Sequence, residues 1–170
     1  MKRAGKTIYH LVGTLQALLI IAGVFCGREA KAAETDDPIV GTWLLVPSQS
    51  VHSDAAQSLE RAFARYEPAD GGAIRFTSEI HRKDGAVIRR GWTAKPDGND
   101  HAVSGDPGFD MIALRRVNRH TILFLYKKEG RILSAQVREV SADLKRMTLI
   151  QLGTSPSGTA INNTVIFDRE

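Results

Sequence analysis

Short connections between strand-like segments constrain this chain more than any other feature. From Ile39 onward, apolar or alternating runs recur at a spacing of roughly 8 to 14 residues, separated by turn sequences such as Asp84-Gly85 and Pro96-Asp97-Gly98. Most connections have about two to seven residues, whereas a parallel crossover needs about a dozen or more. Successive strands must therefore be antiparallel neighbours.

The clearest alternation lies in the run 73–82, where Ile74, Phe76 and Ile80 share one face and mostly polar residues occupy the other. The other predicted strands are 39–46, 86–95, 101–105, 111–118, 121–128, 131–141, 147–153 and 161–168. About 8–10 such strands predict an all-β fold, an antiparallel up-and-down meander β-barrel that leaves no exposed edge. A two-sheet sandwich is the competing arrangement.

One segment departs from this pattern and predicts a short helix after the first strand. Ser53 or Asp54 can cap it, and the apolar residues at helical spacing are Leu59, Ala62, Phe63 and Tyr66. The helix would end near residue 66 or pass into a strand at 64–67. It would serve either as a plug against one barrel end or as a lid over an opening.

Residues 1–33 predict a secretory signal peptide, followed by a single barrel domain at 34–170. Three basic residues near the N-terminus precede an apolar run at 11–25, and Ala30-Lys31-Ala32 supplies a small-x-small cleavage pattern. That run is shorter than the roughly 20 residues that a spanning helix needs. We expect a secreted or periplasmic protein with no membrane span after cleavage.

The surplus positive charge belongs to this leader. Of the 23 basic and 19 acidic residues in the chain, residues 1–33 hold five and one, which leaves eighteen of each in the mature part. Nucleic-acid binding rests on clustered, unneutralised Lys and Arg, so no nucleic-acid partner is expected. The single cysteine, Cys26, also lies in the leader, which excludes thiol catalysis, disulfides and thiolate metal sites from the mature domain.

Other chemical motifs are missing as well. The four mature histidines are not spaced as a local metal site, and the chain has neither a Gly-x-Ser-x-Gly elbow nor a phosphate-binding glycine loop. No catalytic residue, metal or cofactor is predicted, and a cofactor-free barrel enzyme is a third hypothesis that the sequence leaves open.

The segment Gly41-Thr42-Trp43, which opens the first strand, resembles the Gly-x-Trp motif of lipocalins. A wider series extends the resemblance over the mature chain: Tyr66-Glu67-Pro68, Gly71-Gly72, Asp84-Gly85, Ala94-Lys95, Asp97-Gly98, Val103-Ser104-Gly105, Asp110, Ala113-Leu114-Arg115-Arg116, Tyr126-Lys127-Lys128, Gly130, Gly153-Thr154 and Gly158. It is similar to a family of small secreted bacterial lipocalin-like (calycin-type) β-barrel proteins, largely uncharacterised. The chain departs from the family pattern at 142–145, where an Asp-Gly turn is expected, and at 53–63.

An eight-stranded barrel encloses space for side chains or for one small ligand. The resemblance implies this fold and export. It also implies that Trp43 is structural and closes the narrow barrel end against a basic side chain from a late strand, for which Arg169 is the candidate.

Two double arginines, Arg89-Arg90 and Arg115-Arg116, lie inside predicted strands, so one member of each pair must face inward. Arg90 follows Ile88 and Trp92 inward. Arg116 follows Ile112 and Leu114, although Met111, Ala113 and Val117 favour Arg115 equally. An inward guanidinium needs a carboxylate such as Asp106 or Asp110, bound water or an acidic ligand group.

The sequence therefore predicts a barrel that binds a small, partly apolar ligand. The candidate ligand-binding residues are Arg90, Arg116, Trp92, Phe76 and Tyr126. The alternative is a non-enzymatic protein-binding or envelope stress module with a filled core, whose protein partner the sequence does not identify.

Overall fold

The computed structural model describes residues 36–53, 58–155 and 158–170, so the predicted signal peptide lies outside it. Ten strands form one antiparallel sheet in the order β4-β3-β2-β1-β10-β9-β8-β7-β6-β5. Their bounds are β1 Gly41–Leu45, β2 Leu59–Ala69, β3 Ala73–Arg82, β4 Val87–Ala94, β5 Asp97–Ala102, β6 Met111–Asn118, β7 Thr121–Lys128, β8 Arg131–Val140, β9 Arg146–Thr154 and β10 Ala160–Arg169.

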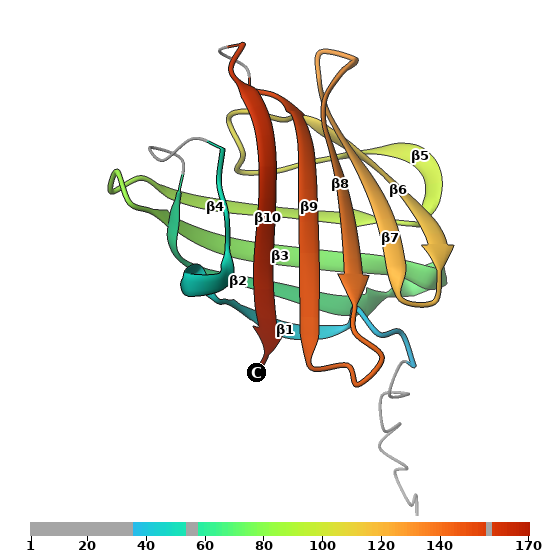
Figure 1. Ribbon diagram of the computed structural model, residues 1–170. Coiled ribbons are helices and arrows are strands. Elements are labelled where there is room, and N and C mark those ends of the chain that lie inside the picture. Colours follow the sequence, from blue (N-terminus) through green and yellow to red (C-terminus); the bar gives the residue numbers. More distant parts are fainter. Residues whose placement is uncertain (1–35, 54–57, 156–157) are drawn as a thin grey trace, which may run out of the picture. The chain divides into compact units, whose positions relative to one another are not determined.

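This sheet folds over on itself, so that β1–β4 run crosswise behind the upright strands β7–β10 (Figure 1). Just beyond the end of β5, Ser104 forms an isolated bridge to β4: the amide of Gly91 donates to the Ser104 carbonyl at 3.1 Å, and the amide of Ser104 donates to the Gly91 carbonyl at 2.9 Å. The result is a nearly closed barrel. The predicted all-β, antiparallel up-and-down architecture is confirmed.

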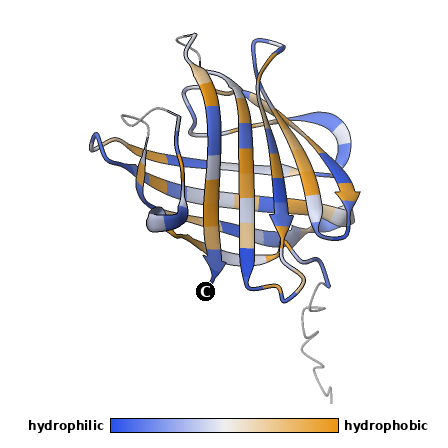
Figure 2. Ribbon diagram, viewed as in Figure 1, coloured by the Kyte–Doolittle hydropathy of each residue, from blue (hydrophilic) through white to orange (hydrophobic). Residues whose placement is uncertain are grey.

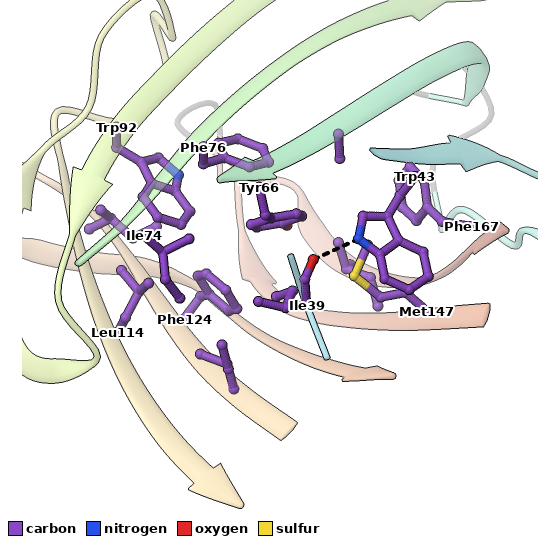
Figure 3. Close-up of a cluster of buried hydrophobic side chains, with 14 of the residues drawn as sticks. Ile39, Trp43, Tyr66, Ile74, Phe76, Trp92, Leu114, Phe124, Met147 and Phe167 are labelled. Carbon is purple, nitrogen blue, oxygen red and sulfur yellow. Dashed lines mark hydrogen bonds between the residues drawn. The ribbon is translucent and has the colours of Figure 1, made fainter. Parts of the chain in front are cut away.

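Apolar and polar bands alternate along most strands (Figure 2), as a half-buried sheet requires. The inward residues gather in one core whose largest members include Trp43, Tyr66, Phe76, Trp92 and Phe124 (Figure 3). Phe76 stacks on Trp92 with ring centroids 4.8 Å apart. The predicted inward face of β3 is therefore the observed one.

The predicted helix at 53–66 is wrong from Leu59 onward, where the chain forms β2; residues 54–57 lie outside the description. Buried Ala62, Ala64 and Tyr66 alternate with more exposed residues, a period of two that the sequence analysis misread as helical. Pairing with β1 on one side and β3 on the other supplies the backbone hydrogen bonds and decides the outcome. The short helical element after β1 is a 3-10 turn at Pro47–Gln49.

A second correction concerns 96–100, predicted as a turn. Pro96 lies in a turn, but residues 97–100 belong to β5, where a register irregularity between Asp97 and Asp100 accommodates Gly98, whose φ is 88°. Among the described residues no helix is long and apolar enough to cross a membrane.

The Gly-x-Trp segment, Gly41 to Trp43, packs against Arg169 in the structure. Trp43 is fully buried, its indole N–H donates to the carbonyl of Ile39 at 2.8 Å, and the guanidinium of Arg169 lies 4.1 Å above its ring. Gly41 makes room for that guanidinium, because a Cβ there would lie 2.4 Å from Arg169 Nη1. Glycine, tryptophan and arginine thus form one packing unit.

Candidate ligand site: a cavity with a buried arginine

A cavity of about 250 Å³ lies inside the barrel. It exceeds the roughly 150 Å³ engineered protein cavity that takes up benzene. Its wall extends from Met147 and Phe167, which lie beside Trp43 in Figure 3, to Ile161 and Ser155 at the β9–β10 hairpin. Much of the wall is apolar, so the cavity suits an apolar body. The filled core of the alternative hypothesis does not predict this space.

Arg138 on β8 is the dominant polar group of the cavity wall. Only 2% of the residue is exposed. Its guanidinium donates to the hydroxyls of Tyr66 and Tyr126, the latter at 2.9 Å, and to Gln136 Oε1 at 2.8 Å. It also lies 4.1 Å above the ring of Phe124. These contacts hold the guanidinium in a fixed orientation in the core.

No carboxylate neutralises Arg138 among the described residues, since the ion pairs found there do not include it. Its Nε is buried and has no hydrogen-bond partner. A guanidinium does not lose its proton in proteins, so a full positive charge stays inside the barrel. An isolated buried charge is expensive, and an anion beside Arg138 would lower that cost.

Tyr66, which contacts Arg138, stays a neutral donor and acceptor. Burial raises the pKa of Tyr66 to about 12, since desolvation outweighs the opposing positive charge of Arg138. Burial lowers the pKa of Arg138, but the hydrogen bonds that the guanidinium donates to Tyr126 and Tyr66 favour its charged form, and the net pKa is raised. The cluster therefore keeps one positive charge throughout the neutral range.

A second arginine on the wall is already paired. Arg90 Nη1 donates to Asp106 Oδ2 at 2.7 Å, and the side chains are only 15% and 7% exposed. Asp106 starts a segment of which Pro107, Gly108 and Phe109 also line the cavity, and Phe109 packs on Tyr126 with centroids 4.9 Å apart. The ion pair ties this segment to β4.

The structure separates the candidate ligand-binding residues into three groups. Phe76 and Arg90 line the cavity. Trp92 and Tyr126 lie behind the wall, where Trp92 stacks on Phe76 and Tyr126 holds Arg138. Arg116 is not part of the wall: it points to the inward side near one barrel end, where it pairs with Asp37 and donates to the carbonyl of Arg119 at 3.1 Å. Arg115 is exposed.

Arg138 was not predicted from the sequence, because β8 buries polar residues and exposes apolar ones, the reverse of the usual pattern. Its inward residues include Ser134, Gln136 and Arg138, while Val137 on the outer face is 36% exposed. The hydrophobic pattern alone would place these faces the other way round. The signal that points to Arg138 is its parity with Val140, which is 2% exposed and packs in the core.

Histidines and acids do not gather into a metal-ligating group of three or more in the part of the chain that the structure describes. His52 is the one cavity-lining histidine, and desolvation, with the nearby charge of Lys83, lowers its pKa. The wall chemistry is that of a binding site with a cationic anchor.

No protein-family model matches the chain, and neither does any curated protein. Among solved structures, it is similar to the wild-type fluorescent protein UnaG, with 14% identity and a TM-score of 0.53 over 78% of this chain and 97% of that chain. A single-residue mutant of UnaG gives 15% identity and a TM-score of 0.54 over 80% and 99%.

Zebrafish ileal bile acid-binding protein complexed with cholic acid gives 10% identity and a TM-score of 0.44, over 78% and 98%. Of these similarities, only the one to UnaG exceeds a TM-score of 0.5. At such low identity it shows the fold alone, an antiparallel β-barrel.

Proposed function

We propose that this protein is exported and binds a small, partly apolar organic anion inside its barrel. The observation that carries the proposal is Arg138, a cation 2% exposed, with no carboxylate partner among the described residues, on the wall of a cavity of about 250 Å³. Charged hydrogen bonds made in such a low-dielectric site are strong and directional. The anionic group meets Arg138 and the apolar body lies against side chains such as Ile80, Leu149 and Val165.

Export is proposed from the leader pattern at 1–33, and a secreted or periplasmic location suits a mature domain without cysteine. Cell fractionation with mass determination of the purified protein tests this. Loss of about the first 33 residues is the expected result, and an intact chain in the cytosol would contradict it.

Calorimetric titration with three ligands of one chain length tests the binding function: decanoate, decanol and decyltrimethylammonium. Decanoate should bind, decanol should bind more weakly, and the cation should not bind. Arg138→Met should weaken decanoate binding by about 10- to 100-fold, because hydrogen bonds to a charged group contribute about 1.5–3 kcal/mol. Decanol binding should persist in this variant, since the apolar wall is unchanged.

Arg115→Met is the matched control, because Arg115 is an exposed strand arginine outside the cavity. Its decanoate affinity should equal that of the unmodified protein. Equal affinity for decanoate and decanol, or full retention of decanoate binding in Arg138→Met, would refute the anion site.

A further inference from the structure

The cavity wall has a definite charge balance. It carries three arginines, Arg82, Arg90 and Arg138. Arg82 Nη2 lies 2.8 Å from Asp84 Oδ2, and Arg90 Nη1 lies 2.7 Å from Asp106 Oδ2. Only Arg138 lacks a carboxylate among the described residues. The wall therefore presents a single uncompensated positive charge.

The Arg90–Asp106 pair and Arg138 line the same cavity. The two arginines share Tyr126: the guanidinium of Arg90 lies 5.7 Å from its ring centroid, and Arg138 Nη2 lies 2.9 Å from its hydroxyl. Asp106 is poorly screened by solvent, since its side chain is 7% exposed. An anion on Arg138 therefore shares its cavity with the poorly screened Asp106 carboxylate.

We infer that Asp106 restricts the ligand head group to a single negative charge, an inference that rests on the proposed anion site. The attraction of a head group to Arg138 rises in proportion to its charge, whereas the cost of removing it from water rises with the square of that charge. A second negative charge on the head group finds no second unpaired arginine among the described residues of the wall, because Asp106 already neutralises Arg90. Carboxylates, sulfonates and sulfate esters fit the site, and phosphate monoesters do not.

Asp106 has a local structural role as well. Its Oδ1 accepts a hydrogen bond from the amide of Gly108 at 2.8 Å, which stabilises the turn that covers the cavity. A substitution here therefore changes both charge and loop geometry. The experiment has to separate these two effects, and paired substitutions of Asp106 and Arg90 do so by restoring the charge balance without restoring the ion pair.

Decyl sulfate and decyl phosphate are matched probes, because both have a tetrahedral head group on the same chain. At about pH 8.5 the sulfate ester carries one negative charge and the phosphate monoester carries nearly two, since its second pKa is about 6. Calorimetric titration below micelle formation gives the ratio of the two affinities within one protein sample. This ratio cancels differences in the active fraction between variants.

The unmodified protein should bind decyl sulfate at least about tenfold more tightly than decyl phosphate, because juxtaposed like charges cost several kcal/mol. Asp106→Asn leaves Arg90 uncompensated, and it should shift the ratio toward the phosphate by about tenfold or more. The double variant Asp106→Asn with Arg90→Met returns the wall to one positive charge. Its ratio should return to that of the unmodified protein.

Asp100→Asn is the control, since Asp100 pairs with Lys127 at 2.6 Å and is not part of the cavity wall. It should leave the ratio unchanged. Equal binding of the two probes by the unmodified protein overturns the inference, as does a ratio unaffected by Asp106→Asn. A shift that persists in the double variant also overturns it, because loop geometry would then be the cause. Failure of both probes to bind would instead refute the proposed function.

Discussion

Arg169 and Gly41 should act as one unit in stabilising the closed end of the barrel. The Arg169 guanidinium donates to three backbone carbonyls, those of Leu144, Val40 and Pro38, each at 2.6 Å. It also covers the ring of Trp43 at 4.1 Å. Removing it with Arg169→Ala leaves three carbonyls without this donor and an uncovered indole.

The cost follows from these contacts. A hydrogen bond from a charged donor contributes about 1.5–3 kcal/mol, and about 1 kcal/mol is the better figure here because Arg169 is half-buried. A cation–π contact with a buried Trp adds about 1 kcal/mol. Arg169→Ala should therefore lower the free energy of unfolding by about 3–4 kcal/mol.

Gly41→Ala should be similarly harmful, because the new Cβ would lie 2.4 Å from Arg169 Nη1 and the residue has φ of 135°. Backbone strain of about 1–2 kcal/mol adds to the lost contacts. In the double variant the arginine contacts are lost only once. The double variant should therefore cost about 2 kcal/mol less than the two single effects together.

Urea unfolding followed by tryptophan fluorescence measures all four proteins in this cycle. Gly98→Ala is the matched control: Gly98 also has positive φ, 88°, but an added Cβ would meet nothing within 4 Å. Its effect should add to that of Arg169→Ala. If the Gly41 and Arg169 effects also add to within about 0.5 kcal/mol, the two residues are not coupled and the reasoning is refuted.

Three further predictions concern pH and backbone space. Between pH 10 and pH 12, Tyr66→Phe should lose about 2–3 kcal/mol less stability than the unmodified protein. The folded pKa of Tyr66, about 12, lies above the ordinary 10.0, so its contribution is complete below pH 10 and is lost as pH rises toward 12. Unfolding midpoints that fall equally in both proteins across this range would contradict the prediction. Asp168→Asn should make the stability fall less steeply with decreasing pH in acid. The hydrogen bond from Arg146 lowers the pKa of Asp168 below 3.8, so the contribution of this carboxylate is lost as pH falls through the lowered value. Equal acid-unfolding midpoints for the variant and the unmodified protein would contradict this. Gly105→Ala should open the β4 edge, because its Cβ would lie 2.1 Å from the Arg89 carbonyl, and unchanged amide exchange at Gly91 would count against this.

The turn at 142–145 shows how tertiary contacts replace a missing local signal. The sequence lacks the expected Asp-Gly there, yet the chain turns with Leu144 at φ 61°. Asp143 accepts from the Ser141 hydroxyl at 2.6 Å and from the Lys145 amide at 3.1 Å, and Arg169 binds the carbonyl of Leu144. These contacts hold a residue in a conformation that normally favours glycine.

Part of the ligand site was predictable for the same reason that the strands were. Arg90 lies between Ile88 and Trp92 in a regular alternation, so its inward direction follows from the period of two. An inward guanidinium needs a counter-charge, and only the structure shows that Asp106 supplies it. Arg116 also follows its neighbours, but it lies near a barrel end where Asp37 reaches it. The period of two predicts which face of a strand a residue lies on, but not how far along the barrel axis that residue lies.

By itself, the sequence determined an all-β antiparallel meander, most of its turns and the glycine–tryptophan start of β1, because strand period, turn residues and short connections are local properties. Only the tertiary structure decided that 59–69 is a strand and that Arg138 lies inside the barrel. Both depend on which face of a strand its neighbours cover, and β8 turns polar residues inward against its own hydrophobic pattern. The cavity and its uncompensated charge arise from strands distant in sequence, since a buried charge is defined by what surrounds it and not by what adjoins it in the chain.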